Sequence, residues 1–163
     1  MMEIWVRDCF EKGTVLTARQ EEKIVGVAVL QSPEDEEIEI INKEDFAYDR
    51  LEKVAGADNI EKFIHMCEVS DADCHKLPIP KWHLVLLAIS NKCNGQGIGS
   101  IMLQKCIIPY LKEHNAKLIT FNTNAEINRR FYIKNGFEEF AVEYLIENGI
   151  RMGNWSYKMS ISD

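Results

Sequence analysis

Three glycines within five residues mark the segment of this chain with the clearest chemical meaning. They lie in residues 94–100 (Asn-Gly-Gln-Gly-Ile-Gly-Ser), which follow an apolar run at residues 82–89 and precede a stretch with the apolar spacing of an amphipathic helix. The order is therefore buried strand, glycine turn, helix. Glycines let a backbone bend tightly and approach a ligand closely, and the free N–H groups of a helix's first turn favour an anion. The segment predicts a binding site for a pyrophosphate.

Neither of two common phosphate-binding loops fits these residues. A Walker loop ends in Gly-Lys-Ser/Thr, whereas here Ser100 follows a glycine with no lysine before it. The dinucleotide fingerprint needs Gly-x-Gly-x-x-Gly at the start of a parallel βαβ unit, with an acidic residue about 20 residues later. The glycines at 95, 97 and 99 have the wrong spacing, and they open the second half of the chain. The ligand is therefore expected to be held by a loop of another kind.

A second motif, residues 128–137 (Asn-Arg-Arg-Phe-Tyr-Ile-Lys-Asn-Gly-Phe), indicates which loop this is. Residues 94–99 resemble the acetyl-CoA loop of the GNAT N-acetyltransferases, Gln/Arg-x-x-Gly-x-Gly/Ala, with Asn94 in place of the usual Gln or Arg. Residues 128–137 look like the family's Asn-x-x-Phe-Tyr-x-Lys-x-Gly-Phe. The gap between the motifs suits a helix, a short strand at residues 117–123 and a second helix. Two motifs in this order and at this separation are far more specific than either alone.

The resemblance implies an α/β (α+β) fold, with a mixed, mostly antiparallel central sheet that is flanked by helices and splayed at the acetyl-CoA site. Residues 1–163 are expected to form a single domain of this kind. The family usually begins with a further strand and helix. Three explanations are open: the true start lies upstream, these elements are lost, or a partner supplies them. An uncovered sheet edge would then be a reason to form a homodimer. Residues 80–84 and 155–159 also look like the puromycin-type branch of small-molecule acetyltransferases.

Apolar periodicity and turn signals predict the other elements. Helices are expected at residues 1–12, 43–55 and 59–67, and strands at 14–19, 23–31, 138–146 and 154–161. The polar segment 71–80, with two prolines, is expected to be a loop. Pro109 falls late in the helix at residues 97–113 and should kink or loosen its last turn. The step Asn148-Gly149 predicts a hairpin turn.

The resemblance also assigns two catalytic candidates. Tyr132 lies where the family often places its general acid; an ordinary tyrosine pKa of about 10 keeps it protonated and able to give a proton to a thiolate. The alternative is an aromatic ring packed beneath the cofactor. His83 lies six residues before Ile89, where related enzymes keep a glutamate or a histidine, and a pKa near 6.5 suits accepting a proton from an amine. A buried histidine satisfied by its neighbours is the alternative, and Glu126 and Glu143 are weaker candidates for the base.

Backbone and polar groups are expected to hold acetyl-CoA. As the resemblance implies, N–H groups of residues 95–100 would bind the pyrophosphate, and the strand ending at Ile89 would pair with the pantetheine arm, with an N–H facing the thioester oxygen. Asn128, one turn before Tyr132, would hold the pantetheine or the tyrosine hydroxyl, whereas Asn124 is the better helix cap. The expected cofactor-binding residues are Leu87, Ala88, Ile89, Asn94, Gly95, Gln96, Gly97, Ile98, Gly99, Ser100, Asn128 and Tyr132.

Composition and charge limit the binding partners and the cellular compartment that can be expected for this chain. The net charge of −7 argues against a nucleic-acid surface and suits a cationic amine. No apolar run approaches the roughly 18 residues of a membrane span, and no signal peptide is evident, so neither membrane insertion nor export is expected. Five cysteines without a CxxC pair are typical of reduced thiols in the cytoplasm. His65, Cys67, Cys74 and His75 match no standard zinc finger, so no metal is expected.

The expected activity is transfer of the acetyl group of acetyl-CoA to a primary amine of a small molecule or peptide, by direct attack in a ternary complex. One alternative is a catalytically silent acyl-CoA-binding regulatory module, for which the departure at Asn94 would be a signature. Another is a toxin-type acetyltransferase that acts on aminoacyl-tRNA, but Arg129, Arg130 and Lys134 are the only clustered basic residues near the motifs. No motif identifies the acceptor.

Overall fold

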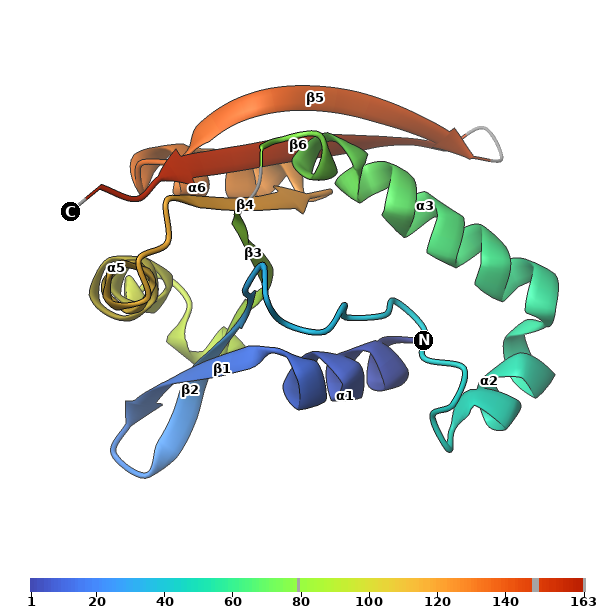
Figure 1. Cartoon of the computed structure of the whole chain (residues 1–163). Coiled ribbons are helices and arrows are strands. Elements are labelled where there is room, and N and C mark those ends of the chain that lie inside the picture. The colour runs from blue at the N-terminus through green and yellow to red at the C-terminus, as the bar shows by residue number, and fades with distance from the viewer. Residues whose placement is uncertain (79, 148–149, 163) are drawn as a thin grey trace.

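Six strands form one mixed sheet in the computed structural model, which describes residues 1–78, 80–147 and 150–162 (Figure 1). The strands are β1 (Thr14–Gln20), β2 (Lys23–Gln31), β3 (Trp82–Ile89), β4 (Leu118–Thr123), β5 (Glu138–Glu147) and β6 (Ile150–Ser160). Their order is β1-β2-β3-β4-β6-β5, and β3–β4 is the parallel pair. The α/β fold predicted from the sequence, with a mostly antiparallel sheet flanked by helices, is confirmed. β6 begins at residue 150 instead of 154, and the turn at Asn148-Gly149 lies outside the described residues.

The helices cover the sheet and the segments beside it. They are α1 (Met2–Lys12), α2 (Tyr48–Ala55), α3 (Ala57–His75), α4 (Ile98–Ile101), a π-helical segment η2 (Met102–Ile107), α5 (Ile108–Glu113) and α6 (Arg129–Lys134), with short 3₁₀ turns η1 (Asn91–Cys93) and η3 (Glu126–Asn128). Of the helices in the described ranges, none combines the length and the hydropathy that crossing a membrane requires.

Helix α3 continues to His75, so the prediction of a loop from residue 71 is wrong for its first five residues. Packing explains the difference, because Ser70 and Cys74 extend the buried face that Ile60 begins, and α3 lies against β4 and β6. The helix ends just before Pro78, as expected because a proline disfavours helical geometry in the residue that precedes it. Tertiary burial therefore outweighs the polar composition of this stretch.

Residues 98–113 form one helical run whose middle section is wider than an α-helix. The N–H of Ile108 bonds to the carbonyl of Leu103, five residues earlier. A proline has no N–H and its ring clashes with the carbonyl four residues before it in a regular helix, so a wider turn directly before Pro109 accommodates it. The predicted loosening is thus present, but it precedes Pro109, and the last turn is regular.

The sheet splays beside His83. β3 pairs with β4 only at Trp82↔Ile119 and His83↔Thr120 among the described residues. Directly afterwards the register between β2 and β3 skips Val85, because the successive pairs are Leu30↔Leu84 and Val29↔Leu86. Such a bulge bends a strand, so β3 turns away from β4 and keeps only β2 as its neighbour. In Figure 1, β3 lies between a lower half of the sheet, β1 and β2, and an upper half, β4, β6 and β5.

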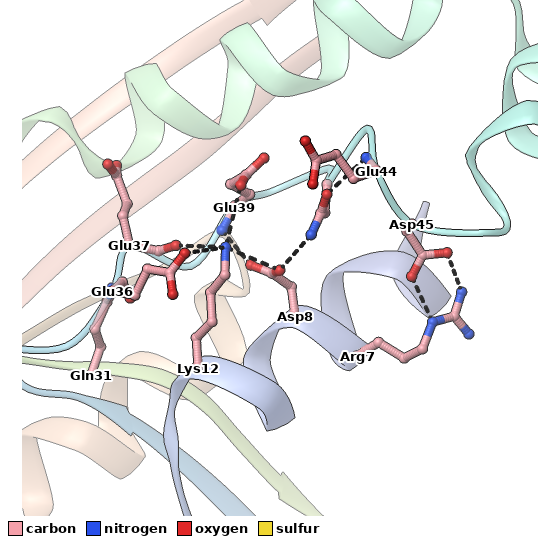
Figure 2. Close-up of polar contacts among 10 residues, drawn as sticks. Arg7, Asp8, Lys12, Gln31, Glu36, Glu37, Glu39, Glu44 and Asp45 are labelled. Carbon is pink, nitrogen blue, oxygen red and sulfur yellow. Dashed lines mark hydrogen bonds and ion pairs between the residues drawn. The ribbon is translucent and has the colours of Figure 1, made fainter.

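Charged side chains attach the segment that follows β2 to helix α1 (Figure 2). The carboxylate of Asp8, which is 2% exposed, accepts hydrogen bonds from the backbone N–H of Glu39 (2.6 Å) and from Asn42 Nδ2 (3.1 Å). Lys12 Nζ lies 3.2 Å from Asp8 and 3.2 Å from the Glu39 carboxylate. Part of the acidic run at residues 34–39 is therefore anchored to α1.

Replacement of Asp8 by alanine should lower the free energy of unfolding by about 2 kcal/mol, because it leaves the backbone N–H of Glu39 and the side chain of Asn42 without their buried acceptor. Urea unfolding followed by circular dichroism measures this loss. A suitable control is Glu3→Ala, which removes an ion pair with Arg7 from a side chain that is 71% exposed and should change stability by less than about 0.5 kcal/mol. Equal losses in the two variants would contradict an anchoring role for Asp8.

Candidate active site

A cleft of about 440 Å³ opens between the end of β3, the glycine turn and α6. Ten of the twelve residues expected to bind the cofactor line it: Leu87, Ile89, Asn94, Gly95, Gly97, Ile98, Gly99, Ser100, Asn128 and Tyr132. Ala88 and Gln96 do not line it; Ala88 is exposed, and the Gln96 side chain donates to the carbonyl of Lys92 (3.4 Å). The structure adds Lys134 to the wall, and its cationic side chain suits an anionic ligand.

The glycine turn leaves an open helix start at one end of the cleft. Gly97 has φ +75°, a left-handed conformation that favours glycine, and a Cβ placed there would meet no atom within 4 Å. No side chain caps the helix that begins at Ile98, so the N–H groups of its first turn are available to a ligand. Gly99 has another role, because a Cβ there would lie 3.1 Å from the Phe131 ring. The helix can thus lie close to α6, and its start can accept an anion.

The unpaired edge of β3 forms the other end of the cleft. Leu87 and Ile89 pair with Ala28 and Gly26 of β2, and within the described ranges β4 pairs with no residue of β3 beyond His83. Successive N–H groups of a strand point to opposite sides, so every second one faces the gap. An extended ligand with amide groups can therefore add to this edge as a further strand would.

Tyr132 lies in the cleft wall within a group of aromatic rings. It is 8% exposed, and its ring centroid lies 4.3 Å from that of Phe121, 5.0 Å from Phe131 and 5.4 Å from Tyr157. Burial raises the pKa of Tyr132, so the phenol keeps its proton at neutral pH. The geometry is compatible with both interpretations from the sequence, the packed ring and the proton donor, and the acid role stays a prediction.

The two asparagines near α6 differ in role. Asn128 lines the cleft at the start of α6, and its side chain does not cap the helix. The prediction that Asn124 caps a helix is wrong, because its Nδ2 donates instead to the carbonyl of Gly153 (3.2 Å) and to Asn154 Oδ1 (3.3 Å). Asn124 therefore holds the turn before α6 to β6, an arrangement that depends on contacts between distant segments.

His83 lies at the last residue pair that joins β3 to β4, outside the walls of the cleft. Its Nδ1 is 3.2 Å from Thr120 Oγ1, and its Nε2 is 3.7 Å from Asp71 Oδ1. Burial lowers the pKa of His83, and the negative charge of Asp71 acts in the opposite direction. The side chain is 25% exposed, so it has neighbours and also access to solvent. Its role as a base stays a prediction.

Asp71 and Cys74 of α3 complete a polar cluster with His83, in which the ligand atoms lie within 4.8 Å of one another. Asp71 is a site residue that the sequence analysis missed, because residues 71–80 were expected to be a loop. The spacing of Asp71 and Cys74 places them on one helical face, so a longer helix would have paired them. The four residues considered for zinc from the sequence all lie on α3, and only Cys74 belongs to this cluster.

The weaker candidates for the base lie elsewhere. Glu126 is 75% exposed and pairs with Arg129 (3.7 Å), and Glu143 is partly exposed on β5. Arg129 also donates to both carboxylate oxygens of Glu139, at 3.0 and 2.8 Å. One of the three basic residues that a transfer-RNA surface would need is therefore engaged within the protein.

Comparison with known proteins identifies the family of the chain. Residues 11–139 match the sequence model described as "Acetyltransferase (GNAT) domain". No sequence among curated proteins matches the chain.

Several solved structures share the fold. The ribosomal-protein-S18-alanine N-acetyltransferase from Escherichia coli is 13% identical, with 100% of this chain and 78% of that chain covered and a TM-score of 0.60. A GNAT family acetyltransferase from Elizabethkingia anophelis with acetyl-CoA bound is 18% identical, with 95% and 80% covered and a TM-score of 0.56. An acetyltransferase from Bacillus subtilis in complex with CoA is 17% identical, with 96% and 82% covered and a TM-score of 0.58.

Proposed function

Because the chain belongs to the GNAT acetyltransferase family, we propose that it transfers the acetyl group of acetyl-CoA to a primary amine of a small molecule or peptide. One observation carries this proposal: an uncapped helix start and an unpaired strand edge border the same cleft. The helix start suits the pyrophosphate of CoA, and the strand edge suits the amide groups of pantetheine. The relatives with acetyl-CoA or CoA bound support the choice of co-substrate.

Transfer proceeds by direct attack in a ternary complex. The backbone N–H at Ile89 stabilises the thioester oxygen as it gains negative charge, an effect typically worth a few kcal/mol. His83 accepts the proton that the attacking amine loses, through Nε2, since Nδ1 is bonded to Thr120. Tyr132 gives its proton to the departing thiolate of CoA. The acid thus acts from the α6 side of the splayed sheet and the base from the α3 side.

The acceptor is a cationic amine and the protein is cytoplasmic. A net charge of −7 favours a positively charged partner over nucleic acid. The carboxylate of Asp71, 32% exposed beside His83, supplies negative charge on the side from which the amine would approach. All five cysteines are free thiols, which suits a reducing compartment. A homodimer through a sheet edge would cover β1 or β5, the two outer strands.

Calorimetric titration with acetyl-CoA, followed by a thiol-release assay with a panel of amines, tests this function. Micromolar binding and thiol release with one class of amine would establish the transferase and name its acceptor. Binding without release on any amine would favour the silent acyl-CoA-binding module. If acetyl-CoA fails to bind, the assignment of the cleft is wrong.

Tyr132→Phe should lower kcat by about 100-fold and leave the acetyl-CoA Kd nearly unchanged, because it removes the proton donor but keeps the ring that packs on Phe121. Thiol release at saturating substrate measures kcat, and calorimetry measures Kd. Tyr110→Phe is the matched control, since Tyr110 stacks on His114 and does not line the cleft. A full rate in Tyr132→Phe would assign Tyr132 to packing alone.

A further inference from the structure

Three side chains that commonly bind metals converge at the point where β3 and β4 diverge. Asp71 and Cys74 are three residues apart on α3 and therefore share one face, and His83 lies on β3. Their ligand atoms lie within 4.8 Å of one another. The cluster forms because α3 packs against β4, next to the parallel pairs that join β4 to β3.

The hydrogen bonds of His83 turn its second ring nitrogen toward an anion. In the tautomer of His83 that carries its hydrogen on Nδ1, Thr120 Oγ1 accepts that hydrogen at 3.2 Å and itself donates to the carbonyl of Trp82 (3.4 Å). In this tautomer Nε2 presents a lone pair to Asp71 Oδ1 at 3.7 Å. A lone pair and a carboxylate oxygen at this separation repel each other unless a cation lies between them.

Two hydroxyl groups beside Cys74, those of Ser156 and Thr120, can donate hydrogen bonds to a thiolate. Ser156, which is 1% exposed, lies beside the thiol, and apart from this sulfur its Oγ has no hydrogen-bond partner among the described residues. A buried hydroxyl without a partner costs about 1–3 kcal/mol, and a thiolate accepts from a hydroxyl far better than a thiol does. Burial, together with the negative charge of Asp71, raises the pKa of Cys74 to about 12, so a thiolate here requires a cation as well.

We propose that Asp71, Cys74 and His83 bind a zinc ion. A mixed carboxylate, thiolate and imidazole set suits Zn²⁺, whereas Mg²⁺ and Ca²⁺ prefer oxygen alone. Three protein ligands leave the fourth tetrahedral position to water, and the thiolate and the carboxylate neutralise the charge of the ion. Access exists because the side chains of His83 and Asp71 are 25% and 32% exposed.

Hydrogen bonds from neighbouring side chains hold two of the three proposed zinc ligands in place. Asn122 Nδ2 donates to Asp71 Oδ1 at 2.7 Å, and Thr120 receives the Nδ1 hydrogen of His83, which leaves Nε2 free for the metal. Such outer hydrogen bonds orient metal ligands and set their tautomers in known sites. Zinc binding at Cys74 releases the thiol proton to solvent, so affinity rises with pH.

Zinc at this site would also regulate acetyl transfer, a consequence that rests on the proposed function. A ring nitrogen that holds zinc cannot accept a proton from the amine, so metal binding and transfer by His83 exclude each other. The metal site itself does not depend on the reaction.

Titration of the full chain with cobalt(II), a spectroscopic substitute for zinc, tests the site without any assay of activity. The wild type is expected to bind one cobalt ion with a thiolate-to-cobalt charge-transfer band that zinc abolishes by displacement. Cys74→Ser should lose the band, and Asp71→Asn should bind cobalt at least tenfold more weakly. Cys67→Ser, a change of a second cysteine on α3 outside the cluster, should keep the wild-type spectrum.

The metal site would be overturned if the wild type binds no cobalt, or if Cys74→Ser keeps the band. Where Cys74→Ser fails to fold, the near-isosteric Asp71→Asn supplies the same comparison. Zinc inhibition, expressed against each variant's own metal-free rate, should be lost in Cys74→Ser and kept in Cys67→Ser. If the cobalt band appears but zinc does not inhibit, the metal site stands and the proposed regulation is wrong. The metal site is thus tested separately from the role of His83 as the base.

Discussion

Replacement of Gly97 by glutamate is expected to weaken acetyl-CoA binding by more than 100-fold. The new side chain would extend from an open position at the helix start and place a carboxylate where the pyrophosphate is expected to bind. At an effective dielectric constant of 20, two unit charges about 4 Å apart repel by about 4 kcal/mol, which exceeds a 100-fold change in Kd. Calorimetric titration of acetyl-CoA measures the effect.

The left-handed backbone at Gly97 adds a second cost, which a matched variant separates. Gly56, between α2 and α3, has φ +80° and lies outside the cleft, and a Cβ at this position would likewise meet no atom within 4 Å. Gly56→Glu carries the same charge and a backbone strain at least as large, because its ψ of 144° lies outside the left-handed region that Gly97 occupies with ψ 6°, and its Kd should equal that of the wild type. An unchanged Kd in Gly97→Glu would show that the pyrophosphate is not bound at this turn.

Replacement of His83 by glutamine should lower kcat by about 100-fold or more, because glutamine keeps a polar contact to Thr120 but cannot accept a proton at neutral pH. The acetyl-CoA Kd should change less than twofold, since His83 does not line the cleft. Thiol release measured with a metal chelator present reports the loss without interference from zinc.

The control for this variant is His65→Gln, which removes an exposed imidazole of α3 that is not part of the cluster. Its kcat should match the wild type. If His83→Gln also transfers acetyl groups at the wild-type rate, the base must be another group or water, and His83 is a buried histidine held by Thr120 and Asp71.

Local signals were sufficient to predict the cleft. The glycine turn, the strand before it and the motif around Tyr132 each act over a few residues, and ten of the twelve residues expected to bind the cofactor line the cleft. Of the two expected residues outside the wall, Ala88 is exposed and Gln96 donates a hydrogen bond to the carbonyl of Lys92. Side-chain directions depend on strand twist and loop closure, which the motif does not specify.

Features that depend on contacts between distant segments were not predictable. The bulge at Val85 lies between the apolar residues Leu84 and Leu86, and no residue type there indicates it. The extension of α3 through Asp71 and Cys74 requires the sheet on which the helix packs. The cluster with His83 therefore became evident only when the fold brought these residues together.

The short pairing between β3 and β4 has a mechanical consequence. Only two residue pairs, Trp82↔Ile119 and His83↔Thr120, join the two halves of the sheet across β3 and β4 in the described ranges. A ligand that fills the gap beyond His83 would take the place of missing strand contacts and stiffen both halves at once. The acetyl donor would then be a structural component as well as a reactant, and each release of CoA would return the sheet to its more compliant form.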